Sequence, residues 1–278
     1  MYKTILVHLN DERRANGLLA AALSVARRFN AHVIGLYVYP AMPTLPPVAV
    51  PYGGEVLKGL VTAAREEADR IRVLFDKATA AQTVVPEWRS VKASHADLAA
   101  VVMEHARAAD LVVASQSDPE WDMSPVLDFP ERLALECGRP VLIVPRVGSY
   151  TRIGERVTVA WSGKREAARA VFDAVPLMKG AKNVRILSVE TAKSAAETAL
   201  PDTEIAAALA RHDIKVTSQR TVAPETSVAD EILNRVADDG SDLLVMGAYG
   251  HSRFRELVFG GVTRGITRHM TVPTLLSH

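Results

Sequence analysis

The feature that most constrains the fold of this 278-residue chain is an internal repeat of short apolar runs and alanine-rich helical patterns. An apolar run at 4–9 is followed by a helical pattern at 16–29, and a run at 156–161 is followed by a helical pattern at 166–178. Regular alternation of strands and helices predicts right-handed crossovers and a parallel sheet with helices on both faces. We therefore expect an α/β protein made of two tandem domains.

Each half continues with the same succession of elements. Second strands are expected at 32–38 and 183–189, long helices at about 55–80 and 195–212, third strands at 86–91 and 215–222, further helices at 96–106 and 228–237, fourth strands at 109–115 and 241–247, and fifth strands at 140–145 and 273–276. The strands are continuous apolar runs, as expected for parallel strands buried on both faces. With a linker at 146–152, the expected domains are 1–148 and 153–278.

The composition fits a soluble protein with a full core, since 48% of the residues are hydrophobic, 23% are charged and 5% are aromatic. A net charge of +1 gives no electrostatic case for binding nucleic acid or an anionic membrane. No apolar run approaches the roughly 20 residues of a membrane span. The N-terminus lacks the order of a signal peptide, and the single cysteine, Cys137, excludes an internal disulfide. We expect a cytoplasmic protein.

The strongest functional signal is a glycine-rich segment near the C-terminus. An apolar run leads into Gly247 and Gly250, and a second pair, Gly260 and Gly261, follows after nine residues. The pattern at 262–269 predicts a helix that begins at this second pair. Glycines permit positive φ and let main-chain N–H groups approach a phosphate closely, and a helix N-terminus favours an anion.

This arrangement resembles the nucleotide-binding signature of the universal stress protein family, Gly-x2-Gly-x9-Gly-[Ser/Thr]. Gly247, Gly250 and Gly260 match the signature in type and spacing. Gly261 stands where the family has a hydroxyl residue, although Thr263 offers a hydroxyl two residues later. The resemblance covers nearly the whole chain as two copies. It implies two flavodoxin-like (adenine-nucleotide α-hydrolase-like) domains, each with a five-stranded parallel sheet and ligands at the carboxyl ends of the strands.

The resemblance also implies ATP or another adenine nucleotide, with Mg²⁺, in the C-terminal half. It places Ala160, Trp161 and Ser162 beside the adenine and ribose, and Val189 and Met246 near the base; Trp161 is equally well explained as a core residue. The remaining candidates for nucleotide contact are Gly247, Gly250, His251, Arg253, Gly260, Gly261, Val262 and Thr263.

The two halves differ where a ligand would bind. The N-terminal segment equivalent to the glycine loop, at 114–125, has no glycine and contains two prolines, a tryptophan and three acids. We therefore expect the N-terminal half to have lost triphosphate binding, which leaves one nucleotide per chain. Asn10 and Ser162 stand where the family has an acid that holds the ribose, so affinity is expected to be reduced. The Pro-rich segment 40–54 is interpreted either as a lid on the N-terminal pocket or as a mobile or partner-binding surface.

The leading hypothesis is a regulatory protein of the stress response that binds an adenine nucleotide. One alternative is a nucleotide-independent interaction or small-ligand-binding protein, and another is an ATP-dependent enzyme of the same α/β group. No positioned base or nucleophile is evident, so at most slow ATP hydrolysis is expected, with no catalytic residue assigned. The resemblance implies that the fifth strands pair as an intramolecular pseudo-dimer, and a bare apolar edge would otherwise invite aggregation. A homodimer and an unknown protein partner are left open.

Overall fold

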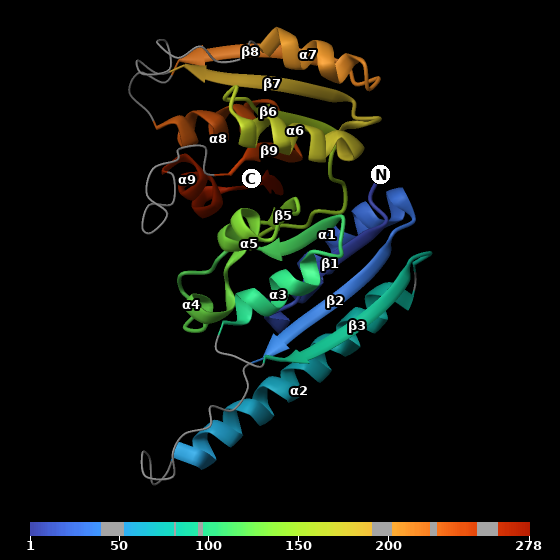
Figure 1. Ribbon diagram of the computed structural model, residues 1–278, viewed down its shortest axis with the longest axis vertical. Helices are drawn as coiled ribbons and strands as arrows, with labels where there is room; N and C mark the ends of the chain where they lie inside the picture. Colours follow the sequence, from blue (N-terminus) through green and yellow to red (C-terminus); the bar gives the residue numbers. More distant parts are fainter. Residues whose placement is uncertain (40–52, 81, 94–96, 191–201, 223–226, 249–260) are drawn as a thin grey trace.

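The computed structural model describes residues 1–39, 53–80, 82–93, 97–190, 202–222, 227–248 and 261–278, and strands alternate with helices through both halves (Figure 1). The N-terminal half contains β1 (Thr4–His8), α1 (Glu12–Phe29), β2 (His32–Tyr39), α2 (Gly53–Ala80), β3 (Val85–Lys92), α3 (Leu98–Ala106), β4 (Leu111–Ser115), α4 (Ser124–Leu127), α5 (Pro130–Glu136) and β5 (Val141–Val144). The C-terminal half contains β6 (Arg156–Ala160), α6 (Arg165–Met178), β7 (Asn183–Glu190), α7 (Asp202–Ala210), β8 (Val216–Val222), α8 (Val228–Asp238), β9 (Leu243–Gly247), α9 (Gly261–His269) and β10 (Thr274–Ser277).

The expected strands are all present, while some helix boundaries differ. Helix α1 begins at Glu12, before the alanine-rich pattern, because the Asp11 side chain caps it by accepting a hydrogen bond from the Arg13 main-chain N–H at 2.9 Å. Helices α4 and α5, which the sequence analysis did not predict, follow β4. Both carry proline in their first turn, where a missing N–H has no cost. The Pro-rich segment lies outside the described residues, except for its last two, which begin α2.

The described strands form one ten-stranded sheet in the order β3-β2-β1-β4-β5-β10-β9-β6-β7-β8. Within each half all neighbouring strands are parallel, which confirms two tandem α/β units with five parallel strands each. The strand order changes direction between β1 and β4 and again between β6 and β9. Such switch points open a crevice at the carboxyl ends of the strands, where ligands of open α/β sheets bind.

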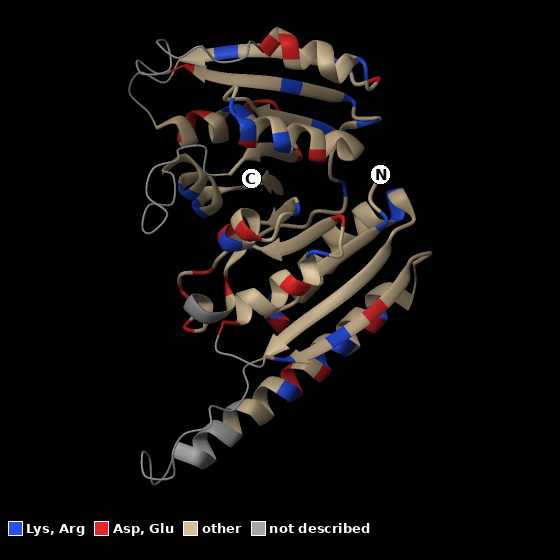
Figure 2. Ribbon diagram, in the orientation of Figure 1, with Lys and Arg blue, Asp and Glu red and all other residues tan. Residues whose placement is uncertain are grey.

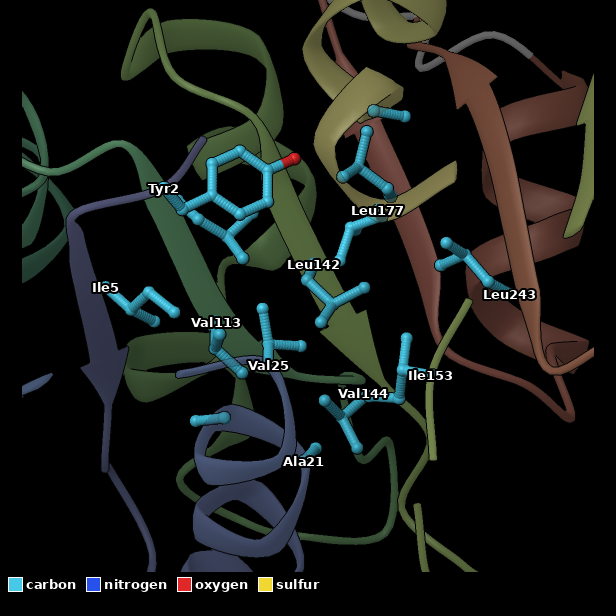
Figure 3. Packing of buried hydrophobic residues seen from close by; sticks show 14 of the residues in the cluster. Tyr2, Ile5, Ala21, Val25, Val113, Leu142, Val144, Ile153, Leu177 and Leu243 are labelled. Atoms are coloured by element: carbon cyan, nitrogen blue, oxygen red, sulfur yellow. The ribbon is translucent and has the colours of Figure 1, made fainter. Parts of the chain in front are cut away.

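The two halves meet through the strands β5 and β10, which pair antiparallel with Leu142 opposite Leu275. This is the edge-to-edge pairing expected from the two fifth strands. The apolar core is continuous across this junction: Figure 3 shows Leu142 and Val144 of β5 on the side of Leu177 and Ile153 from the C-terminal half, within one buried cluster. Burial of these side chains stabilises both halves together.

Hydrogen bonds also link the halves. The Tyr2 hydroxyl donates to the main-chain oxygen of Asp173 on α6 at 2.6 Å. The Arg28 guanidinium, at the end of α1, donates to the main-chain oxygens of Leu177, at 2.9 Å, and Lys179. These are carbonyls at the C-terminus of α6, where a cation is favourable. In the part of the chain that the structure describes, no helix is long and apolar enough to cross a bilayer.

Candidate functional site

The carboxyl ends of β9, β6 and β7 lie side by side in the C-terminal half. Ala160, at the end of β6, is in register with Met246 on one neighbour and with Leu187 on the other. Ala160 and Met246 are buried, and the half-buried Val189 and Val262 pack against the same apolar cluster. The carboxyl ends of these strands are therefore lined by apolar side chains.

Trp161 belongs to the core on the opposite face of the sheet from Ala160. Its side chain is 6% exposed and packs in the larger apolar cluster, and its main-chain N–H donates to the Leu187 oxygen at 2.8 Å. The next residue, Ser162, is exposed. Of the two explanations that the sequence left open for Trp161, the structure supports the core residue.

Gly247 ends β9 directly against the first turn of α6. A Cβ atom at this position would lie 2.5 Å from both the Glu166 carbonyl carbon and the Ala167 nitrogen. Gly247 is not among the described residues with positive φ. The glycine pattern predicts positive φ and a close phosphate, but at Gly247 the close neighbour among the described residues is the backbone of α6.

Helix α9 begins at Gly261, where a Cβ atom would meet nothing within 4 Å. This first residue is exposed, whereas Thr263 and Ile266 are buried. A Cβ at Gly265 would lie 2.7 Å from the Ala229 Cβ, so glycine at this position allows α9 to pack closely on α8. Packing along its side thus holds α9, and among the described residues nothing lies within 4 Å of a Cβ atom at its first residue.

Four of the predicted site residues, Gly250, His251, Arg253 and Gly260, lie outside the described residues. Their part in a site stays a prediction. The described candidates fall into two groups: those at the ends of β6, β7 and β9, and those in the first turn of α9.

The equivalent place in the N-terminal half is filled by the protein's own side chains. The Leu9 N–H donates to the oxygen of Leu36 on β2 at 2.9 Å, as the Trp161 N–H does to its β7 neighbour. His8 is therefore equivalent to Ala160. The buried His8 ring stacks on Phe129, with ring centroids 5.0 Å apart. Burial lowers the pKa of His8 to about 4, so this ring is neutral near pH 7.

A carboxylate lies beside this ring pair. Asp128 accepts hydrogen bonds from Arg14 Nη2 at 2.9 Å, from Asn10 Nδ2 at 2.8 Å, from the Ser124 hydroxyl at 2.8 Å and from the Asp118 N–H at 2.9 Å. The Arg14 guanidinium also lies over the Trp121 ring, 4.6 Å from its centroid, at cation–π distance. The group at the centre of these donors is an internal anion.

The profile of the Universal stress protein family matches the chain twice, over residues 1–145 and 155–278. The chain belongs to the universal stress protein family. A solved universal stress protein from Archaeoglobus fulgidus DSM 4304 is similar over 99% of this chain and 95% of that one, with a TM-score of 0.73 and 13% identity. A functionally unknown protein from Pseudomonas aeruginosa PAO1 is similar over 99% and 92%, with a TM-score of 0.58 and 14% identity. These two likenesses show the fold.

Among characterised sequences, Universal stress protein Slr1230 from Synechocystis sp. (strain PCC 6803) is 46% identical over 48 residues. That match spans 17% of this chain and 17% of the relative. The membership in the universal stress protein family therefore rests on the two profile matches, which together cover both halves.

The two halves of this tandem universal stress protein carry unlike residues at the carboxyl ends of their first strands, Ala160 in one and His8 in the other. Acidic residues gather along the segments around α4 (Figure 2). One of them, Asp128, accepts hydrogen bonds from Arg14, Asn10, Ser124 and the Asp118 N–H, so this carboxylate is part of the structure around α4. Sequence reasoning missed Arg14, His8 and Phe129. Two signals were available in the sequence. Arg14 lies on an otherwise apolar helical face, and His8 occupies the position equivalent to Ala160 in the other half. Among the described residues, no group of three or more His, Cys, Asp or Glu side chains could hold a metal ion.

Proposed function

We propose that this universal stress protein is a regulatory protein that binds one ATP, or a related adenine nucleotide, in its C-terminal half. The observation that carries the proposal is the N-terminus of α9 at Gly261, where the next residue, Val262, packs against the same apolar cluster as Ala160 and Met246. A helix N-terminus presents unpaired N–H groups and a positive dipole end, which together suit a phosphate.

In this proposal, one group of described residues binds the adenine and ribose, and a second group faces the phosphates. Ala160, Met246 and Val189 would pack against the adenine, and the exposed Ser162 would hydrogen-bond the ribose. Gly261 and the first turn of α9 would face the phosphates. Mg²⁺ is commonly held by substrate phosphates and water with few protein carboxylates, so the described residues suit an ion that arrives with the nucleotide.

Binding rather than turnover is proposed, because the sequence shows no positioned base or nucleophile. The N-terminal half is assigned no nucleotide. Its equivalent positions hold the His8–Phe129 stack and the buried Asp128 carboxylate. A regulatory switch would then depend on the occupancy of a single site in the chain.

The test is calorimetric titration of the full chain with Mg-ATP, together with mass spectrometry of any ligand released from freshly purified protein. We expect one site per chain and a loss of binding in Gly250→Val, which blocks the glycine motif. Gly59→Val is the matched control, because Gly59 lies on α2 in open space and far from the site in sequence. No ATP binding by the wild-type chain would overturn the proposal and favour a nucleotide-independent interaction protein.

A further inference from the structure

A side chain of the N-terminal half ends on helix α9 of the C-terminal half. Gln116 directly follows β4, and its side chain is buried, with 5% of the residue exposed. Its Nε2 donates to the main-chain oxygens of Thr267, at 2.9 Å, and Arg268, at 3.0 Å. The last carbonyls of a helix have no partner within the helix, so this amide caps α9 from the other half.

The surroundings fix Gln116 in this position. Its Oε1 accepts the Arg146 N–H at 3.1 Å, and its main-chain N–H donates to the Val144 oxygen at 2.8 Å. Its main-chain oxygen accepts Arg14 Nη1 at 3.2 Å. Because the carbonyls of α9 can only accept and the Arg146 N–H can only donate, one orientation of the side-chain amide satisfies all these bonds.

The C-terminal end that Gln116 caps and the N-terminal end at Gly261 belong to the same short helix, α9. At about 1.5 Å rise per residue, Gly261 lies roughly 9 Å along the axis from Thr267. The close packing of Gly265 on Ala229 holds the middle of α9, and Gln116 holds its C-terminal end. These two contacts fix the direction of the α9 axis. They therefore also fix the position of the main-chain N–H groups in its first turn.

The support is one-sided. Gln116 is equivalent to Ala248, since each donates its main-chain N–H at 2.8 Å to the fifth strand of its own half, at Val144 and Ser277 respectively. Ala248 is completely buried, and its methyl group has no donor to offer. The N-terminal half therefore supports a helix of the C-terminal half through Gln116, and a side-chain bond of this kind has no reciprocal counterpart at Ala248.

We propose that Gln116 is a positioning residue for the phosphate side of the nucleotide site, acting through α9 across the boundary between the halves. The inference rests on the proposed nucleotide site in the C-terminal half. It predicts a selective effect: loss of the Gln116 amide displaces the groups that face phosphates and leaves the base-side residues Ala160 and Met246 in place.

The test measures ATP and adenosine binding to the full chain with Gln116→Met, which keeps the side-chain length but removes its hydrogen bonds. We expect the Kd for ATP to rise roughly fivefold to tenfold, and the Kd for adenosine to change less than twofold. Gln116→Asn, which keeps an amide on a shorter stem, should also weaken ATP binding. Tyr2→Phe is the control, since it removes a bond between the halves that ends on α6.

Hydrogen exchange of the nucleotide-free protein supplies an independent reading. Amides of α9 should exchange faster in Gln116→Met and be unchanged in Tyr2→Phe. Wild-type protein that binds no ATP would overturn the proposed function and this inference together. ATP binding that is unchanged in Gln116→Met, or weakened equally for adenosine, or weakened equally by Tyr2→Phe, would overturn this inference alone.

Discussion

Arg14 and Asp128 form a two-point ion pair, with Nη2 2.9 Å from Oδ1 and Nη1 3.2 Å from Oδ2. The two side chains are 8% and 1% exposed. A buried charge without its partner has a large desolvation cost, whereas a buried pair that is fully hydrogen-bonded is tolerated. The pair therefore fastens the segment around α4 and α5 onto helix α1.

The first prediction concerns this pair. Arg14→Met should lower the free energy of unfolding by about 3–5 kcal/mol, because it leaves the Asp128 carboxylate buried and uncompensated. The double variant Arg14→Met with Asp128→Asn should recover part of that loss. Urea denaturation of the single and double variants measures the coupling. Additive effects of the two substitutions would contradict the arrangement described above.

The second prediction is a dependence of stability on pH. Burial, assisted by the nearby charge of Arg14 and opposed by Asp128, lowers the pKa of His8 to about 4 from an ordinary value of 6.5. Between these values the unfolded chain binds a proton that the folded chain does not, so stability falls as the pH is lowered from 6.5 to 4. The loss should reach about 3 kcal/mol.

Thermal unfolding over this pH range tests the assignment to His8. His8→Leu should remove most of the loss of stability between pH 6.5 and 4, and the leucine side chain still packs against Phe129. A variant that keeps the full slope would place the responsible group elsewhere.

The third prediction compares two glycines of the motif. Gly247→Ala should lower the free energy of unfolding by about 1–3 kcal/mol, because its Cβ would overlap the backbone of α6. Gly261→Ala should change it by less than about 0.5 kcal/mol, since its Cβ meets open space. Chemical denaturation of both variants gives the comparison. Equal effects would show that α6 does not set the requirement at Gly247.

The fourth prediction is the stoichiometry of nucleotide binding. A titration with ATP should saturate at one equivalent per chain, because the His8–Phe129 stack and the buried Asp128 side chain occupy the equivalent place in the N-terminal half. The same value is expected by calorimetry and by equilibrium dialysis with labelled nucleotide. Two equivalent adenine-nucleotide sites in one chain would refute it.

The fifth prediction concerns separated halves. Residues 1–148 and 153–278, expressed apart, should associate or unfold at lower temperature than the full chain, because each exposes an apolar edge strand, β5 or β10. Analytical ultracentrifugation and circular dichroism measure both properties. Two fragments that are monomeric and as heat-stable as the whole chain would contradict the shared core.

Much of the fold could be predicted from the sequence because it depends on local patterns. The apolar runs gave the strands, and the matching fifth strands predicted their pairing. The helical pattern at 16–29 begins four residues after the observed start of α1 at Glu12. The first turn of this helix is polar and depends on the Asp11 cap. The short helices α4 and α5 have too few residues for a helical period to be visible.

The difference between the two halves at the expected ligand position could be predicted only in part. Absence of glycine at 114–125 indicated a lost phosphate site, but what fills it depends on contacts such as Arg14 with Asp128, more than a hundred residues apart in the chain. Gln116 was missed for a similar reason, because its partners belong to the other half. The packing of Gly247 against α6 could not be predicted, because the spacing of glycines in a motif does not say which helix lies beside them.

The pairing of β5 with β10 has a consequence for how this protein can change. When two identical chains pair across a twofold axis, each substitution occurs on both sides at once. Here both sides are parts of one chain, so Gln116 and Ala248 are inherited separately although they occupy equivalent places. Pairing within one chain thus removes the constraint of identity, so a substitution in one half leaves the other half unchanged.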